Sequence, residues 1–121
     1  CVVPAHKKLP LLLGNGIKFD GSAICFSSER ADHVSVTENG IDDAISLVDL
    51  PVPNVYSAAL SEFVFAAGVK LLQRDRPQLL YLSTTDYIQH KFAPGSSGAN
   101  ASRIEAIIPK CTSCHRVGCS R

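Results

Sequence analysis

"VYSAALSEFVFAAGVKLLQRDRPQLLYL", residues 55–82, decides the fold class, because it reads as one long helix followed by one buried strand. Apolar side chains recur at helical spacing along a single stripe. Asn54 could cap the start of this helix, and basic residues followed by Pro77 form a typical helix end. We therefore predict a helix over about 55–73, with a stripe of Leu60, Phe63, Val64, Ala67 and Leu71.

The four residues "LLYL" (79–82) are apolar without alternation. Such a run is typical of a strand that is covered on both faces, as in a parallel sheet between helices. A helix, a short turn and a buried strand together indicate an α/β fold with a mostly parallel sheet. Ligands of such sheets gather beyond the carboxyl ends of the strands, which is where Asp86 is expected to lie.

The remaining chain predicts shorter elements. We expect a strand end at Val2-Val3, a short helix over 9–13, a strand over 23–28 and a turn at Asn39-Gly40. Residues 45–55, with two prolines, are expected to be an extended connection.

Composition narrows the class of protein. The chain has 121 residues, 45% hydrophobic and 19% charged, with a net charge of +1. We expect one small domain with a real core, and neither a nucleic-acid nor a membrane partner. Because it begins with Cys1 and contains no methionine, we expect a fragment of a longer protein. Five unevenly spaced cysteines suggest a reducing, cytoplasmic location rather than a disulfide framework.

Asp86 and His90 are four positions apart and allow two interpretations. On one helical turn they would share a face and could bind one zinc ion. Alternatively, Asp86 caps a helix, with Gln89 completing a capping box and His90 lying on the surface. The residues alone favour the cap, because two ligands do not make a site. The preceding Thr84 and Thr85 could supply a nucleophile or a ligand, but such residues more often bond to nearby backbone.

Four blocks follow one another in the chain: "ICFSSERAD" (24–32), "ENGI" (38–41), "VYSAALSEFVFAAGVKLL" (55–72) and "YLSTTDYIQHKFAPG" (81–95). Together they resemble the phosphonoacetate hydrolases, a family within the alkaline phosphatase superfamily. The resemblance covers roughly residues 2–100. It implies an α/β sandwich with two zinc ions and a threonine nucleophile. The implied reaction splits the carbon–phosphorus bond of a small-molecule phosphonate, giving acetate and phosphate from phosphonoacetate.

The resemblance also implies roles for individual residues. The family's Asp-x-x-x-His zinc pair falls on Asp86 and His90, which would bind one zinc. In "VVPAHKKL" (2–9), Lys8 matches the second of two substrate-facing lysines, and His6 stands where the family has the first. The family's nucleophile and other zinc ligands have no match here, so we expect the isolated chain to be inactive. We therefore take residues 1–100 as a partial catalytic domain.

Residues 101–121 depart from this pattern. "CTSCH" (111–115) fits a c-type haem motif, and Cys111, Cys114, His115 and Cys119 could instead form a small zinc knuckle. A disordered or foreign tail is the interpretation we favour. Two alternatives to the family function therefore stand. One is another superfamily member, such as a phosphodiesterase or nucleotide pyrophosphatase, and the other is a non-enzymatic haem or zinc binder.

Overall fold

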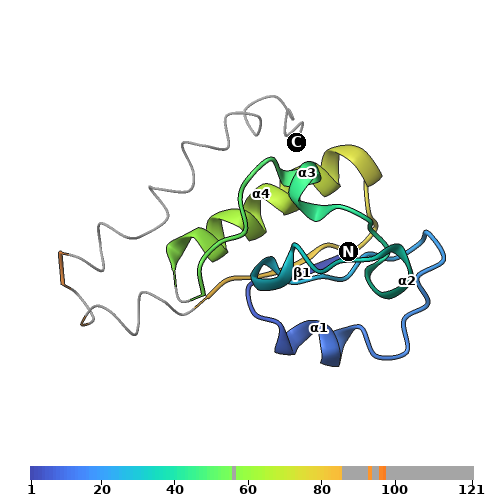
Figure 1. The fold of residues 1–121 in the computed structure, drawn as a ribbon, viewed down its shortest axis with the longest axis horizontal. Coiled ribbons are helices and arrows are strands. Elements are labelled where there is room, and N and C mark those ends of the chain that lie inside the picture. The colour runs from blue at the N-terminus through green and yellow to red at the C-terminus, as the bar shows by residue number, and fades with distance from the viewer. Residues whose placement is uncertain (56, 86–92, 94–95, 98–121) are drawn as a thin grey trace, which may run out of the picture. The chain divides into compact units, whose positions relative to one another are not determined.

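The computed structural model describes residues 1–55, 57–85, 93, 96 and 97. Residues Cys1–Thr85 form one unit and Asp86–Arg121 another. All named helices and strands belong to the first unit (Figure 1). This unit contains both helices and strands, as the sequence predicts. In chain order they are β1 (Val2–Pro4), α1 (Lys8–Leu13), the 3-10 helix η1 (Ser28–Arg30), α2 (Val36–Asn39), α3 (Ala44–Val48), α4 (Ala58–Asp75) and β2 (Tyr81–Ser83).

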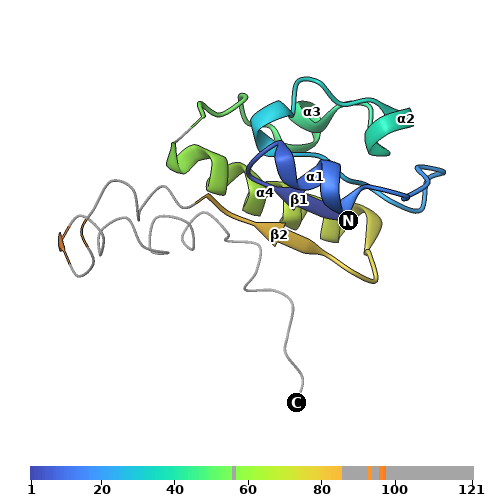
Figure 2. The same ribbon diagram turned by 90° about the horizontal axis from the view of Figure 1, so that it is seen from below.

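Strand β1 is the centre of the sheet. It pairs in parallel with β2, in a register that places Val3 opposite Leu82. On its other side, Val2 forms an isolated parallel bridge with Cys25. The views agree that the two strands lie between α4 and α1 (Figures 1 and 2). The described part of the chain is therefore a small α/β layer arrangement with a parallel sheet.

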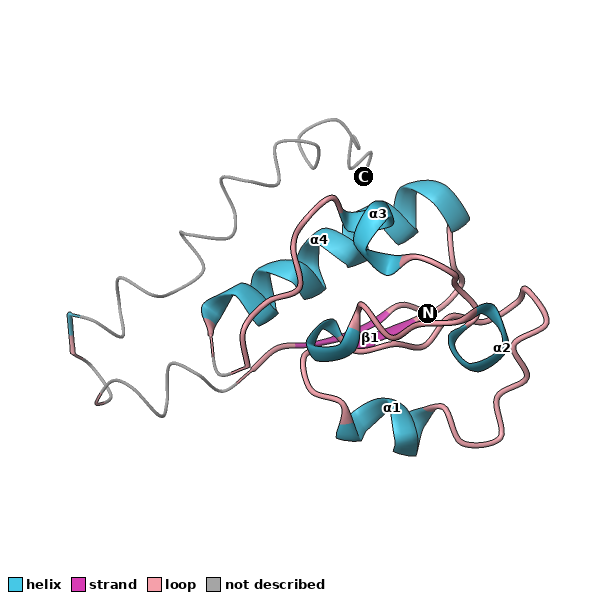
Figure 3. Cartoon of the chain, in the orientation of Figure 1, coloured by secondary structure: helices cyan, strands magenta, loops and turns pink. Residues whose placement is uncertain are grey.

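The expected strand over 23–28 is reduced to that one bridge. The Val2 amide donates to the Ile24 carbonyl and the Phe26 amide to the Val2 carbonyl, over 2.8 and 3.2 Å. The chain then turns into η1 at Ser28 instead of continuing along β1. Helix, strand and loop segments are distinguished by colour in Figure 3.

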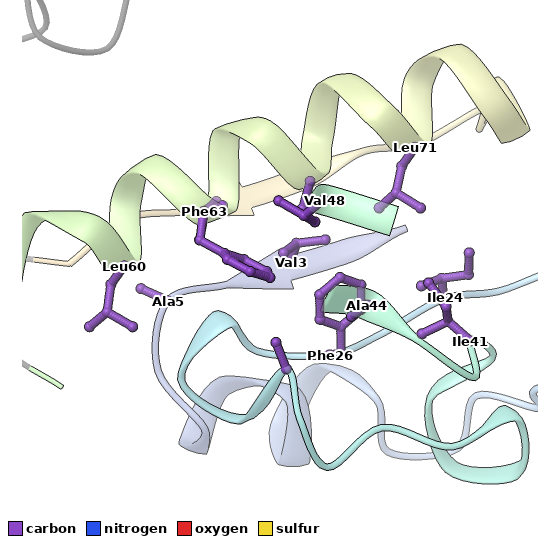
Figure 4. Packing of buried hydrophobic residues seen from close by; sticks show 13 residues of the cluster. Val3, Ala5, Ile24, Phe26, Ile41, Ala44, Val48, Leu60, Phe63 and Leu71 are labelled. Carbon is purple, nitrogen blue, oxygen red and sulfur yellow. The ribbon is translucent and has the colours of Figure 1, made fainter. Parts of the chain in front are cut away.

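Helix α4 confirms the long helix and its stripe. All five stripe residues are buried. Figure 4 shows that Leu60, Phe63 and Leu71 lie on the side of α4 that faces β1, the strand that carries Val3. The helix begins three residues later than Asn54 would allow, because Ser57 is the N-cap residue. The Ser57 hydroxyl donates to the Asn54 carbonyl over 2.7 Å, so Asn54 shapes the turn that leads into the helix.

Strand β2 packs closely against α4 at Gly68. A Cβ atom at this position would lie 2.6 Å from Leu82 Cδ1, so only glycine lets the helix and strand approach this far. The prediction of burial on both faces was wrong for this unit, because Leu79 and Tyr81 are 74% and 42% exposed. Within this unit, the face of β2 that carries Leu82 packs against the core, whereas Leu79 and Tyr81 are exposed.

Two short helices replace parts of the expected loops. Helix α3 occupies the start of the segment predicted to be extended, and the Asp43 side chain caps it by accepting a hydrogen bond from the Ser46 amide. Helix α2 ends at Gly40, whose φ of 75° provides the left-handed turn expected at Asn39-Gly40. None of the helices among the described residues is both long and apolar enough to cross a membrane.

The two phenylalanines of α4 allow a matched test of this packing. Phe63 is 1% exposed, whereas Phe65, one half-turn away, is 39% exposed. We expect Phe63→Ala to lower the free energy of unfolding by about 3–5 kcal/mol, because it removes a buried ring and leaves a cavity. Phe65→Ala should cost about 1 kcal/mol or less. Urea unfolding of both variants measures the difference, and equal losses would contradict the assignment of the buried face.

Candidate functional site

Because β1 and β2 are parallel, their carboxyl ends meet at one edge of the sheet. β1 continues there into Ala5 and His6, and β2 continues into Thr84 and Thr85. The Ala5 amide donates to the Ser83 carbonyl over 2.8 Å, which holds the two exits side by side. This edge is the place where parallel sheets bind ligands.

Ser28 holds this edge of the sheet in place through two backbone carbonyls. Its side chain is fully buried, and its hydroxyl lies 3.2 Å from the carbonyl oxygens of both Ala5 and Leu60. A hydroxyl has one proton, so the two carbonyls share it. Ser28 thereby connects the exit of β1 with the first turns of α4.

His6 bridges the two strand exits. Its Nε2 lies 3.2 Å from the Thr85 hydroxyl oxygen, and its Nδ1 lies 3.5 Å from Glu29 Oε2. The imidazole is therefore placed between a carboxylate on one side and a hydroxyl on the other. These contacts join positions that are far apart in the sequence, which is why no local pattern indicated them.

The Glu29 carboxylate is held at this edge by several contacts. Its Oε2 accepts a hydrogen bond from the Lys7 amide over 3.1 Å, and its Oε1 lies 3.5 Å from the Lys7 ammonium. Burial alone would raise the pKa of Glu29. The Lys7 amide, the charge and side chain of Lys7, and the His6 ring outweigh burial and hold this pKa below its usual value. Glu29 is therefore a carboxylate at neutral pH.

Lys8 is the first residue of α1 and is exposed. The structure thus places it directly after the β1 exit, two positions from His6. Of the two adjacent lysines, Lys7 is the one paired with Glu29 in the described part of the chain. The substrate role predicted for Lys8 is not tested by this arrangement and stays a prediction.

Asp86 and His90, the predicted zinc pair, lie outside the described residues. The last described residue before them is Thr85, whose amide donates to the Ser61 hydroxyl of α4 over 3.3 Å. Within the described ranges, no three His, Cys, Asp or Glu side chains gather in a way that could hold a metal ion. The tail cysteines with His115 are likewise outside the described residues.

A hollow of about 350 Å³ lies between α1, η1 and α2. Its charged lining side chains are Lys7, Arg30 and Glu38, together with His33. Lys7 belongs both to this hollow and to the edge formed by the strand exits, whereas His6 and Thr85 do not line the hollow.

Solved structures that are similar to this chain include two of phosphonoacetate hydrolase from Sinorhizobium meliloti 1021. The structure in complex with phosphonoformate is 59% identical and the one with phosphonoacetate 60%, each with a TM-score of 0.78. Each match covers 84% of this chain and 25% of that chain. The chain resembles one quarter of phosphonoacetate hydrolase. No family model matches it.

The similarity to phosphonoacetate hydrolase confirms the resemblance seen in the sequence blocks. A TM-score of 0.78 at 59–60% identity shows that the two share this part of the fold. Sequence reasoning missed Glu29, Ser28 and Ser61 as residues of the edge. The first two stand within the matching block "ICFSSERAD", which was the available signal, although the block alone assigns them no role.

The lowered pKa of Glu29 predicts how acid affects the unit. A carboxyl whose pKa is lower in the folded state stabilises the fold fully above its ordinary pKa, and this contribution disappears as the pH falls through the lowered value. We expect wild type to exceed Glu29→Gln in unfolding free energy near neutral pH, with the difference shrinking from about pH 5 to about pH 3. Urea unfolding across this range measures it.

The control for this titration is Glu38→Gln, which neutralises an exposed glutamate of α2. It changes the net charge by the same amount without touching the β1 exit. A difference between wild type and Glu29→Gln that stays constant with pH, or that Glu38→Gln reproduces, would contradict the assignment.

Proposed function

We propose that this chain is the part of a carbon–phosphorus hydrolase that contributes one metal-binding pair and part of the substrate pocket. The observation that carries the proposal is the 59–60% identity to phosphonoacetate hydrolase over 84% of the chain. Because the chain spans a quarter of that relative, the catalytic activity is proposed for an enzyme that contains this segment. Turnover by the 121 residues alone is not expected, since most of the catalytic groups that the resemblance implies have no match among them.

The proposed substrate is a small phosphonate that also carries a carboxylate. Both solved relatives are complexes with such compounds, phosphonoacetate and phosphonoformate. Lys8, exposed directly beyond the carboxyl end of β1, would pair with one of the anionic groups. His6 lies at the same exit, so the chain presents an imidazole where the resemblance implies a second lysine.

The proposed metal ligands are Asp86 and His90. An Asp oxygen and a His nitrogen are donors that zinc accepts, but two ligands leave the usual four-coordinate site incomplete. Thr85, the residue before Asp86, lies at the carboxyl edge of the sheet beside His6, which supports this position for a ligand. When bound, zinc would lower the pKa of a coordinated hydroxyl and neutralise charge that develops on phosphoryl oxygens.

The chain's own residues would hold the substrate and exclude wrong orientations. Lys8 would fix one charged end of the phosphonate. The substrate carboxylate can stabilise the carbanion that leaves when the carbon–phosphorus bond breaks, which an unsubstituted alkyl phosphonate cannot do. The proposed superfamily fold, an α/β sandwich, agrees with the parallel strands between α1 and α4.

The metal pair can be tested in a chimera in which residues 1–100 replace the matching quarter of the Sinorhizobium meliloti enzyme. Asp86→Asn keeps the shape and capping ability of the side chain but removes its negative charge. We expect zinc content to fall and phosphonoacetate hydrolysis to drop by more than about a hundredfold. His90→Ala should behave similarly. Full zinc content and near-normal hydrolysis in Asp86→Asn would favour the helix cap instead.

The substrate contact is tested in the same chimera. We expect Lys8→Ala to raise KM for phosphonoacetate by about tenfold or more, because it removes a charged donor to an anionic group. Zinc content should not change. The matched control is Lys18→Ala, which removes another exposed lysine from a loop of the same unit. A chimera that cleaves a phosphodiester but not phosphonoacetate would instead support a different superfamily activity.

A further inference from the structure

The start of helix α1 carries positive charge and has no capping side chain of its own. Its N-cap residue, Lys7, offers no side-chain hydrogen bond, and the first turn contains no acidic residue. The amides at a helix start lack partners within the helix, and positive charge there is unfavourable. Two consecutive lysines, Lys7 and Lys8, therefore stand where a capping acceptor would normally be found.

Glu29 supplies the missing acceptor from 22 positions further along the chain. Its Oε2 accepts the Lys7 amide proton over 3.1 Å. The side chain of Glu29 is only 11% exposed, so this carboxylate is largely shielded from water. A hydrogen bond to a charged acceptor is among the stronger ones in proteins. The nearby Lys7 ammonium, 53% exposed, adds little by comparison.

The backbone of Glu29 makes a second attachment on the other side of His6. Its amide donates to the Ala5 carbonyl over 3.1 Å. The residue before His6 and the residue after it are therefore both bound to the same glutamate. This fixes the backbone of His6 at two points, and Ser28 shares the anchoring at Ala5.

The His6 ring is oriented by the same carboxylate. Nδ1 lies 3.5 Å from Glu29 Oε2, and Nε2 lies 3.2 Å from the Thr85 hydroxyl. A carboxylate beside one ring nitrogen favours a proton on that nitrogen and thereby selects the tautomer. The row Glu29, His6 and Thr85 thus connects η1, the β1 exit and the end of β2.

We infer that Glu29 is a positioning residue, which holds the His6–Lys8 segment and, through the His6 ring, the Thr85 end of β2. Its relevance to catalysis rests on the proposed function, because Lys8 and Asp86 are the proposed substrate and metal contacts. The clamp itself rests only on the described contacts. Glu29 is distant in sequence from both segments, so no local sequence pattern indicates its positioning role.

The clamp is tested in the full chain by amide hydrogen exchange and by nitrogen NMR of the His6 ring. In Glu29→Ala we expect the Lys7 amide to exchange at least about tenfold faster. The His6 ring signals should shift toward those of a mixed tautomer population. Glu29→Gln, which keeps an acceptor but loses the charge, should lie between this variant and wild type. The amides of Val64 and Leu71 in α4 should be unchanged.

The control variant is Glu38→Ala, which should match wild type at Lys7 and His6. Unchanged Lys7 exchange and His6 signals in Glu29→Ala would overturn the clamp. Equal acceleration at Val64 and Leu71 would also overturn it, because the role would then be one of general stability. If Glu29→Ala does not fold, Glu29→Gln provides the same comparison.

A second measurement connects the clamp to the site. Phosphonoacetate is titrated into the chimera that carries residues 1–100 of this chain, and we expect Glu29→Gln to weaken binding at least about threefold. Equal affinity would overturn the positioning role. If the chimera with unaltered residues 1–100 does not bind phosphonoacetate, the proposed function fails, whereas exchange and ring signals in the full chain still decide the clamp.

Discussion

The two-sided pairing of β1 is the interaction on which the rest of the unit depends. Val3 is completely buried, and the strand hydrogen-bonds to β2 on one side and to the Ile24–Phe26 segment on the other. Burial of apolar side chains such as Leu60 and Phe63 against this strand contributes about 1.5–3 kcal/mol each. Helix α4 packs against this strand and also against α3, η1 and β2, so its stripe joins all of them in one core.

The same pairing creates the candidate site. Parallel strands end at a common edge, so His6 and Thr85 are in contact although they are 79 positions apart in the sequence. Ser28 and Glu29 then anchor the β1 exit through the Ala5 carbonyl and the Lys7 amide. The groups that stabilise the fold here are thus next to Lys8, which is proposed to bind substrate.

The sequence predicted those features that have a local cause. The α4 stripe follows from helical spacing, and the Gly40 turn from the freedom of glycine at positive φ. The α/β class follows from the succession of helix and strand. The helix over Ala44–Val48 was missed because two following prolines suggested extension, whereas a capping bond from Ser46 to Asp43 favours a helix.

The site was only partly predictable for a related reason. Lys8 could be named because it stands in a recognisable stretch, and Glu29 could not be given a role because its partners are distant in sequence. The burial of β2 was overestimated, since an apolar run shows that a strand can be covered but not which residues cover it. Tyr81 and Leu79 remain accessible in this unit.

The pairing of the first strand of the unit with its last strand also determines how the unit can fold. The backbone nitrogen of Cys1 donates to the Leu79 carbonyl, 78 positions away, and the two strands pair beside this contact. Closing a loop of that length costs about 4 kcal/mol in chain entropy before the strands gain anything in return. Contacts between residues so far apart in the sequence slow folding. A ribosome would therefore have to release nearly the whole segment before β1 could find its partner.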